Sequence, residues 1–303
     1  MNVMVLSKAQ EDLISPTIQR IVDKIKPEII ICYGSRTTTL IESGIFVMAD
    51  GSRESELHTF DLLIITSDDL KPEHINIVET AENEAFLPIK VICITYKIGY
   101  VNNAVRRNVL FFCWVVMQGR VLFDRGEKQL LICESVPQKD LAIDWERWYD
   151  LATKYLSLAD HSFANGWYKQ TAFLCHQVVE STCIGLLRVF TGYRSRTHNI
   201  KRLLKLTQTF SVLPGTIFPG VTCQERGILR LITNAYIDTR YKDSYEISKA
   251  DAGVVLERAK LFLSSGDELY KRQNTKSIIV EPLVEQFEIL RKPVFNPTQI
   301  LEI

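Results

Sequence analysis

The sequence predicts an α+β protein, a small mixed-sheet domain followed by an all-helical bundle. Two observations lead to this prediction. Over residues 1–128, short apolar runs with strand character alternate with amphipathic stretches, as in a sheet covered by helices. From residue 144 onward, apolar residues recur at helical spacing with few interruptions. We therefore expect a first domain at 1–128, a linker at 129–143, a helical domain at 144–274 and a C-terminal tail at 275–303.

The elements of the first domain alternate along the chain. Apolar runs rich in β-branched residues indicate buried strands, and amphipathic stretches indicate covering helices. In chain order we expect a helix at 8–25, strands at 28–33 and 60–66, a helix at 70–84, a strand at 89–95, a helix at 101–117 and a strand at 120–123. The pattern then breaks down up to about residue 143, and Pro137 lies inside this stretch, which is typical of a linker.

The second half shows helical stripes of apolar residues. Apolar side chains recur every three or four residues over 145–159 and again over 175–190. Such stripes bury one face of a helix against partners and so predict a bundle. Ser248 and Asp251 have the Ser-x-x-acid spacing that caps a helix N-terminus. Further helices are expected at 199–207, 223–237 and 249–272.

Composition narrows the class of protein. Lysine plus arginine and aspartate plus glutamate balance at 36 each, so contact with nucleic acid requires a local patch, since there is no global positive field. No run of about 18 apolar residues and no signal-peptide pattern is present, which indicates neither membrane insertion nor export. The seven cysteines are scattered, without disulfide or metal spacing, and are expected to be reduced core residues of a cytoplasmic protein.

The first domain carries a motif on two apolar runs. One run ends in Gly34-Ser35-Arg36, and the second begins at Asp61. This order resembles the minimal, DNA-polymerase-beta-like nucleotidyltransferase family, whose signature is hydrophobic-Gly-Ser, a spacer and Asp-x-Asp. The resemblance implies that Gly34, Ser35 and Arg36 bind nucleotide phosphates at a turn, and that Asp61 is a catalytic residue and a Mg²⁺ ligand. Backbone N–H groups can cradle a phosphate, and Mg²⁺ prefers carboxylate oxygens.

The match departs from that signature in several places. Thr59 stands where the first carboxylate belongs, and the expected strand at 89–94 carries no acidic residue. One Asp is a poor substitute for three, because two Mg²⁺ ions need several carboxylate oxygens. The spacer at 36–58 contains a second Gly-Ser-Arg at 51–53, which competes for the cradle role, although the stronger strand before the first favours the first. In the alternative interpretation, the first Gly-Ser is an ordinary turn and Asp61 lies on the surface at a strand end.

Three segments of the helical half carry a second resemblance. They are residues 173–180, 197–204 and 238–241, with the sequences FLCHQVVE, THNIKRLL and DTRY. In this order and spacing they resemble the HEPN domain family, helical bundles of prokaryotes that are often paired with nucleotidyltransferase-like proteins. The match spans roughly residues 144–272. The resemblance implies a nucleotide or RNA as the ligand and a homodimer formed through the helical domain.

The third of these segments bears on chemistry. Many members of the family are ribonucleases whose signature is an Arg followed, after about four to six residues, by a His. In this chain Tyr245 follows Arg240 at that place, and a tyrosine with an ordinary pKa of about 10 is a poor base at neutral pH. By resemblance we expect Arg240, Tyr241, Tyr245 and His198 to contact a nucleotide or RNA without cleaving it. For His198, which follows Thr197 at an expected helix start, the alternative is an end-capping or packing role.

Other polar residues of the helical half allow two interpretations. His176 and Glu180 lie one turn apart and are expected to form an internal hydrogen bond rather than a site. A basic cluster is either a solvated face or a phosphate contact; it consists of Arg194, Arg196, Lys201, Arg202 and Lys205.

Together the two resemblances predict a nucleotide- or RNA-binding protein with a degenerate nucleotidyltransferase domain and a HEPN domain, in a regulatory, defence or toxin-antitoxin setting. The alternative function is catalytic. It is a nucleotidyltransferase that uses Asp61, or a HEPN ribonuclease that uses Arg240.

Overall fold

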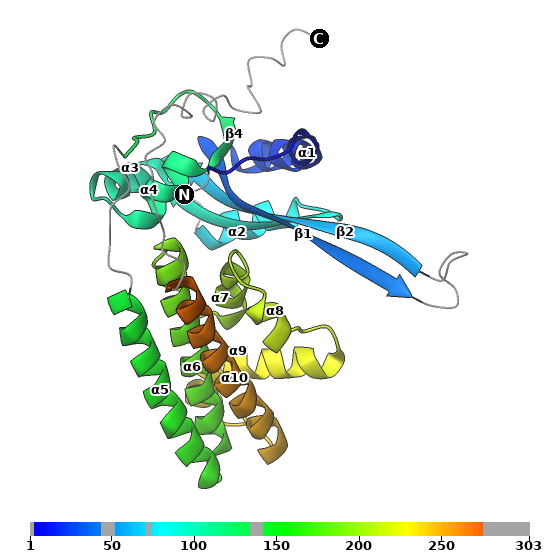
Figure 1. The fold of residues 1–303 in the computed structure, drawn as a ribbon, viewed down its shortest axis with the longest axis vertical. Coiled ribbons are helices and arrows are strands. Elements are labelled where there is room, and N and C mark those ends of the chain that lie inside the picture. Colours follow the sequence, from blue (N-terminus) through cyan, green and yellow to red (C-terminus); the bar gives the residue numbers. More distant parts are fainter. Residues whose placement is uncertain (1–2, 44–51, 71–73, 134–141, 275–303) are drawn as a thin grey trace. The chain divides into compact units, whose positions relative to one another are not determined.

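The computed structural model describes residues 3–43, 52–70, 74–133 and 142–274 (Figure 1). These residues form two compact units, each with its own core, and the division falls between residues 133 and 142. The first unit contains a mixed sheet and the second consists of helices, which confirms the predicted α+β class. The predicted tail and most of the predicted linker lie outside the described residues.

The first unit is a four-stranded sheet with helices on both faces. The strand order is β3-β2-β1-β4, with β2 and β3 parallel and the other neighbours antiparallel. Its elements are α1 (Lys8–Ile25), β1 (Ile29–Ser43), β2 (Ser52–Thr66), α2 (His74–Asn83), β3 (Ile89–Lys97), α3 (Ile98–Arg106), α4 (Leu110–Gln118) and β4 (Arg120–Asp124).

The two faces of the sheet are buried by different helices. Ile30, Phe60 and Val91 belong to a core cluster that also includes residues of α1 and α2. The alternate side chains point the other way, because successive residues of a strand face opposite sides. On that second face, Tyr96 of β3 contacts Phe112 of α4 edge to face. Burial on both faces explains why the strands are apolar runs without alternation.

The first two strands are longer than predicted and form an arm. β4 pairs only with residues 29–32 of β1, and β3 pairs only with residues 58–66 of β2. Beyond these ranges β1 and β2 pair with each other alone, and the ribbon extends away from the sheet (Figure 1). The predicted strand end after residue 33 is therefore wrong. The register of the β1–β2 pair shifts at a bulge at Tyr33, and the β-branched residues at 37–39 continue the strand beyond it.

The predicted helix at 101–117 is two helices, α3 and α4. Between them Asn108 adopts a left-handed backbone conformation with φ of 53°. Asparagine tolerates this conformation better than most residues, and it ends a helix. The apolar pattern continues across the break, so periodicity alone did not reveal it.

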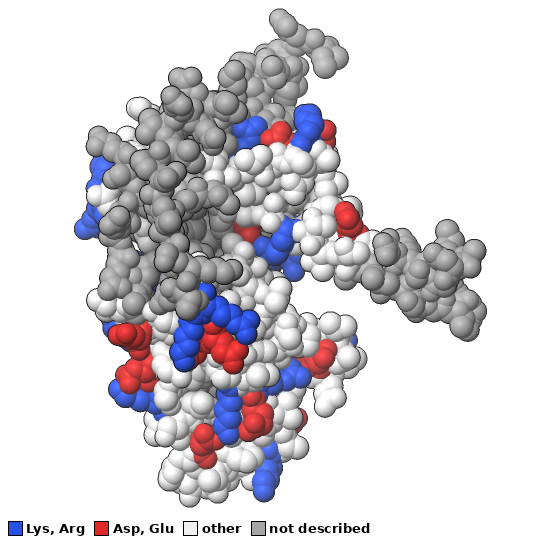
Figure 2. Space-filling model, in the orientation of Figure 1, with Lys and Arg blue, Asp and Glu red and all other residues white. Residues whose placement is uncertain are grey.

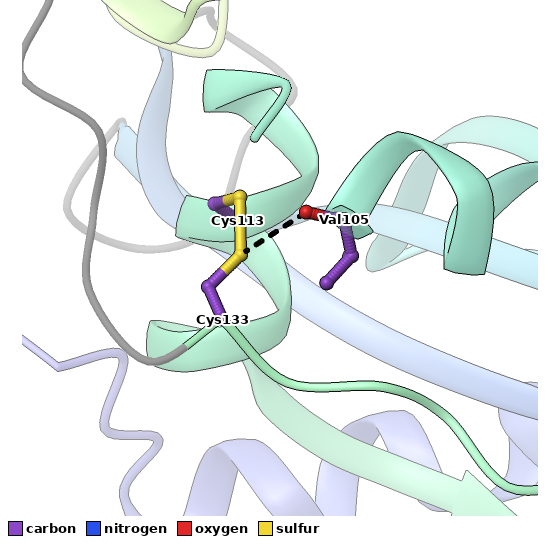
Figure 3. The surroundings of a disulfide bond; sticks show 3 residues. All are labelled: Val105, Cys113 and Cys133. Atoms are coloured by element: carbon purple, nitrogen blue, oxygen red, sulfur yellow. Dashed lines mark hydrogen bonds between the residues drawn. A yellow bond between two sulfur atoms is a disulfide. The ribbon is translucent and has the colours of Figure 1, made fainter. Parts of the chain in front are cut away.

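Two cysteines of the first unit are bonded, contrary to the prediction that all are reduced. Cys113 on α4 forms a disulfide with Cys133 (Figure 3). The Sγ atom of Cys133 also lies 3.9 Å from the carbonyl oxygen of Val105 (Figure 3). The partners are 20 positions apart in the sequence, which is no recognisable disulfide spacing. Cys223 is exposed, whereas the remaining four free cysteines are buried as predicted.

The second unit is a bundle around one central helix. Its elements are α5 (Ala142–Ala164), α6 (Tyr168–Thr191), α7 (Ile200–Thr207), α8 (Leu213–Ile217), α9 (Cys223–Tyr241) and α10 (Lys249–Asn274). The short α8 was not predicted. The predicted cap of the last helix is confirmed, because the backbone N–H of Asp251 donates to Oγ of Ser248 at 3.0 Å. Helix α9 continues four residues past its predicted end at 237, which moves Arg240 from a loop into the last helical turn.

Helix α6 is the core of the bundle. It is the one helix among the described residues that is long and apolar enough to cross a membrane, and 72% of its most apolar stretch is buried inside the unit. Its buried positions occur on all sides of the helix, in contrast to the single apolar stripe of a surface helix. The neighbouring helices of the bundle thus account for its hydrophobicity.

Candidate functional site

The motif residues of the first unit lie inside paired strands. Gly34, Ser35 and Arg36 are register partners of Asp61, Phe60 and Thr59, respectively. The predicted turn at Gly34-Ser35 is therefore wrong, in either the functional or the ordinary interpretation. The role of these three residues in nucleotide binding stays a prediction, but it has lost the phosphate cradle that motivated it. Of the competing Gly-Ser-Arg, Gly51 lies outside the described residues, and Ser52 and Arg53 begin β2.

Asp61 is a fully buried carboxylate paired with a guanidinium. Its Oδ2 atom lies 2.7 Å from Nη1 of Arg36, whose side chain is only 27% exposed. The absent side chain of Gly34 makes room for this carboxylate, because a Cβ atom at Gly34 would lie 2.6 Å from Oδ2. The expectation that Asp61 is a surface residue at a strand end is thus wrong. Gly34 and Arg36 of β1 therefore accommodate Asp61 of β2 in a buried ion pair.

This arrangement does not fit a two-metal site. Thr59, at the place of the first carboxylate, is buried and has Arg36 and Lys90 as its register neighbours on β1 and β3. Register neighbours point to the same face of a sheet, so two cationic side chains flank the position. No group of three His, Cys, Asp or Glu side chains able to hold a metal ion is found in the part of the chain that the structure describes. Arg36 already neutralises the one carboxylate that the motif offers.

The candidate site of the second unit is built on Tyr236 and Arg240, one turn apart on α9. The guanidinium carbon of Arg240 lies 3.8 Å from the centre of the Tyr236 ring, and Nε of Arg240 donates to the Tyr236 carbonyl at 2.8 Å. The ring of Phe173, from α6, stacks on Tyr236 at 6.2 Å. Cation–π contact holds the planar guanidinium over the ring. Among the described residues, no carboxylate pairs with Arg240.

His198, in the segment that precedes α7, also packs against the Tyr236 ring. Its ring is parallel to the Tyr236 ring within 8°, with 5.1 Å between centres. Oε1 of Glu180, on α6, lies 2.7 Å from Nδ1 of His198. An ionised carboxylate can only accept hydrogen bonds, so Nδ1 of His198 carries the proton that it donates to Glu180. Nε2 is then available to a ligand. The side chain of His198 is 58% exposed, which makes it reachable. We call Arg240, Tyr236, His198 and Glu180 the Arg240 cluster.

Glu180 is held from its other side by His176. Nδ1 of His176 lies 2.9 Å from the carbonyl oxygen of Ile232 and so donates to it, while Nε2 lies 3.2 Å from Oε2 of Glu180. His176 and Glu180 are in contact as predicted, but Glu180 also belongs to the candidate site through His198. Burial raises the pKa of Glu180, but hydrogen bonds to His176 and His198 outweigh burial and lower this pKa below its ordinary value of 4.5. Glu180 is therefore a carboxylate that positions His198.

The structure brings together only part of the predicted ligand set. Arg240 and His198 share Tyr236, and Tyr241 lies beside Arg240 with 5.4 Å between its ring centre and the guanidinium. Tyr245 does not join them. It packs against Ala235 and Ile247 and lines a different groove. Burial raises the pKa of Tyr245 to about 12, with a further contribution from Asp238, which makes it an even poorer base than predicted.

Sequence reasoning missed Tyr236. The only signal was its spacing of four residues before Arg240, which places the two side chains on one face of a helix. Because the helix was predicted to end at 237, this spacing was not recognised.

Comparison with known proteins supports the assignment of the helical unit. Residues 145–269 match the family model of the HEPN domain, which confirms the resemblance of this half. No curated protein matches the chain. An archaeal HEPN homologue of known structure shares 23% identity, covering 44% of this chain and 98% of its own, with a TM-score of 0.31.

Two further solved structures are similar. A protein from Thermus thermophilus shares 22% identity, covering 41% of this chain and 96% of its own, with a TM-score of 0.31. A nucleotidyltransferase-like protein from Exiguobacterium sibiricum shares 12% identity, covering 91% of this chain and 83% of its own, with a TM-score of 0.30.

Proposed function

We propose that the helical unit binds a nucleotide or RNA at the Arg240 cluster. One observation carries the proposal: the Arg240 guanidinium is held over the Tyr236 ring on its own helix, without a carboxylate partner in the described part of the chain. Since only Nε is engaged by the helix, the two terminal nitrogens offer donors in a fixed plane. Such a fork matches the oxygens of a phosphate and stays charged at every physiological pH.

The neighbours of Arg240 suit the rest of a nucleotide. The exposed ring of Tyr241 offers a face on which a base can stack. Nε2 of His198 offers a hydrogen bond. Three exposed cations, Arg194, Arg196 and Lys201, lie within a few residues of His198 and can contact further phosphates.

Because the chain has no net charge, a polyanionic ligand can be attracted only by a local group of cationic side chains. On the face shown in Figure 2, positive and negative side chains are interspersed. Attraction of a polyanion thus depends on individual contacts such as Arg240 rather than on a global field.

The setting of this activity follows from family resemblance. HEPN relatives commonly dimerise through their bundles, and we infer that this protein is a homodimer of the same kind. We also infer a cytoplasmic, regulatory, defence or toxin-antitoxin role, in which the first unit is a nucleotidyltransferase-like domain without transferase activity. The Arg36–Asp61 pair supports this view, because it occupies the carboxylate that a metal ion would need.

The proposal is tested by fluorescence anisotropy with a short labelled single-stranded RNA. We expect Arg240→Ala to weaken binding by at least about tenfold, which corresponds to about 1.4 kcal/mol. Arg226→Ala, an exposed arginine in the first turn of the same helix, is the matched control and leaves affinity unchanged. Equal affinities of Arg240→Ala and the unaltered protein would remove the assigned role.

A second candidate function is RNA cleavage at the same cluster. The observation that favours it is the Glu180–His198 hydrogen bond of 2.7 Å, which orients an exposed imidazole beside Arg240 through their shared contact with Tyr236. Histidine moves protons near neutral pH, and an oriented ring does so more efficiently. Metal-free cleavage of RNA that is lost in both His198→Ala and Arg240→Ala would establish this function in place of binding alone.

A further inference from the structure

A short strap ends the described part of the first unit. It consists of residues 129–133, with the sequence QLLIC, and it contacts both α3 and α4. Asn102 of α3 binds the strap through its carboxamide: Nδ2 donates to the carbonyl oxygen of Gln129 at 3.0 Å, and Oδ1 accepts from the backbone N–H of Leu131 at 2.8 Å. The first of these bonds is exposed and the second is half-buried, and such bonds open easily at a protein surface. A covalent contact therefore decides how firmly the strap is held.

That covalent contact is the disulfide between Cys133 in the strap and Cys113 of α4 (Figure 3). The two Cα atoms lie 5.7 Å apart, the usual separation for bonded cysteines, so the fold itself brings the two thiols together. Cys113 is fully buried and Cys133 is 7% exposed, whereas Ile132 beside it is 40% exposed. The strap side of the bond is thus the side nearer to solvent, and an oxidant or reductant reaches Cys133 first.

The same place also suits the reduced cysteines. The Sγ atom of Cys133 lies 3.9 Å from the carbonyl oxygen of Val105, to which a thiol can donate and a disulfide sulfur cannot. Cys113 follows the buried Phe112 on α4, and a buried free cysteine behaves as a small apolar residue. The reduced pair therefore leaves no polar group stranded, so the first unit accommodates both redox states.

We propose that Cys113 and Cys133 are a reversible redox modification site that fastens or releases the strap. In the cytoplasm, where we place this protein, disulfides are usually transient and respond to oxidants. The oxidant class is a peroxide. The thiolate of Cys133 attacks one oxygen of hydrogen peroxide, the O–O bond breaks, hydroxide leaves with the thiol proton as water, and Cys133 becomes a sulfenic acid. The Cys113 thiol then displaces the sulfenic hydroxyl as a second water, and the S–S bond forms.

The reverse reaction uses two molecules of glutathione, which supply the two electrons. The first thiolate attacks the sulfur of Cys133, which forms a mixed disulfide and frees Cys113 as the leaving thiol. The second attacks the glutathione sulfur of the mixed disulfide, so Cys133 returns to the thiol and glutathione disulfide leaves. Both half-reactions meet the protein at Cys133, the more exposed of the two sulfurs.

Reduction changes what holds the strap. In the bonded state the strap is tied covalently to α4, whereas in the reduced state Asn102 and the half-buried side chains of Leu130 and Leu131 hold it. A disulfide restricts the open states of the segment that it closes, so reduction makes release of the strap more frequent. The chain continues from the strap toward α5, so release lengthens the connection between the two units.

Mass mapping of the full-length protein tests the bond. The protein is reduced, treated with hydrogen peroxide and alkylated at its free thiols. We expect peptides joined through Cys113 and Cys133 after peroxide, and their separation after excess glutathione is added. Cys223, an exposed free cysteine, is the internal comparison. Oxidation of Cys223 while Cys113 and Cys133 are both alkylated would overturn the proposal, and so would a bond that glutathione does not open.

Hydrogen exchange of the strap amides tests the consequence. We expect the amides of residues 129–133 to exchange at least about tenfold faster in the reduced protein than in the oxidised protein. Cys133→Ala should show the fast rate under both conditions. The amides of α1, in the same unit, should exchange equally in all samples, which shows that the unit stays folded. Equal exchange of the strap in the two redox states of the unaltered protein would contradict its release. None of these measurements involves the Arg240 cluster.

Discussion

Asp61 and Arg36 form an ion pair that holds the base of the β1–β2 arm. The carboxylate is fully buried, and the guanidinium supplies its countercharge at 2.7 Å. Removing one partner of a buried pair leaves the other uncompensated, which is much more costly than replacing both. The chemistry that a family motif assigns to a residue therefore depends on what the fold places beside it.

Asp61→Ala is expected to lower the free energy of unfolding of the first unit by about 3–5 kcal/mol, because Arg36 loses its buried partner. Urea unfolding measured by circular dichroism gives this value. Asp12→Ala, which breaks an exposed pair with Lys8 on α1, is the control and changes stability little. Equal effects of the two substitutions would show that Asp61 is not part of a buried pair.

Glu180 gives the helical unit a pH dependence with a defined sign. Since the pKa of Glu180 is lowered in the folded state, its stabilising contribution is present above pH 4.5 and is lost as the pH falls through the folded pKa. Glu180→Gln should therefore destabilise the protein at pH 7 and much less at pH 3. Glu146→Gln, at an exposed position of α5, is the control. A Glu180→Gln effect that is constant over this pH range would contradict the account.

Some of the site residues could be predicted and others could not. His198 and Arg240 stand out because their residue types and spacing resemble a family motif. Tyr236 and Glu180 join them only through contacts between α6, α9 and the segment before α7, and the spacing of one chain segment does not reveal such contacts. The burial of Asp61 likewise follows from the pairing of β1 with β2 and could not be read from either strand alone.

Among the elements, the regular helices followed their patterns and the arm did not. Helices α1 and α7 begin and end close to their predicted limits, since one apolar face and a capping residue define each of them. The β1–β2 arm was missed because Gly-Ser is a usual turn signal. In this sheet the glycine instead gives a neighbouring carboxylate room within the strand pair.

Gly34→Ala tests this role of the glycine in β1. The added Cβ would lie 2.6 Å from Oδ2 of Asp61, so we expect a loss of about 1–3 kcal/mol in the unfolding free energy of the first unit. Gly227→Ala makes the same chemical change where nothing lies within 4 Å, and it should stabilise its helix by about 1 kcal/mol. A neutral or stabilising Gly34→Ala would mean that β1 and Asp61 do not approach as described.

At the scale of the whole molecule, the first unit should not transfer nucleotides. Arg36 neutralises Asp61, and two cationic residues flank Thr59, so too little negative charge is present to hold two Mg²⁺ ions. Incubation with each labelled nucleoside triphosphate and Mg²⁺ should give no incorporation into the protein or RNA above background. Metal-dependent incorporation that disappears in both Asp61→Asn and Asp61→Ala would overturn this expectation.

The helical unit should pair with a second copy of the chain. Light scattering is expected to give about twice the chain mass of 34.8 kDa, with no change in Arg240→Ala, because that side chain contacts its own helix. A monomeric mass at micromolar concentration would remove the inferred homodimer while leaving the Arg240 cluster intact.

The central claim, that Arg240 contacts a phosphate of the ligand, is tested most directly by the salt dependence of RNA binding. Each phosphate neutralised by a cationic side chain releases counterions and adds about 0.7 to the slope of log affinity against log salt for a single strand. We predict that the slope for Arg240→Ala is smaller than that of the unaltered protein by about this amount, while Arg226→Ala keeps the full slope. An unchanged slope in Arg240→Ala would contradict a phosphate contact at this residue.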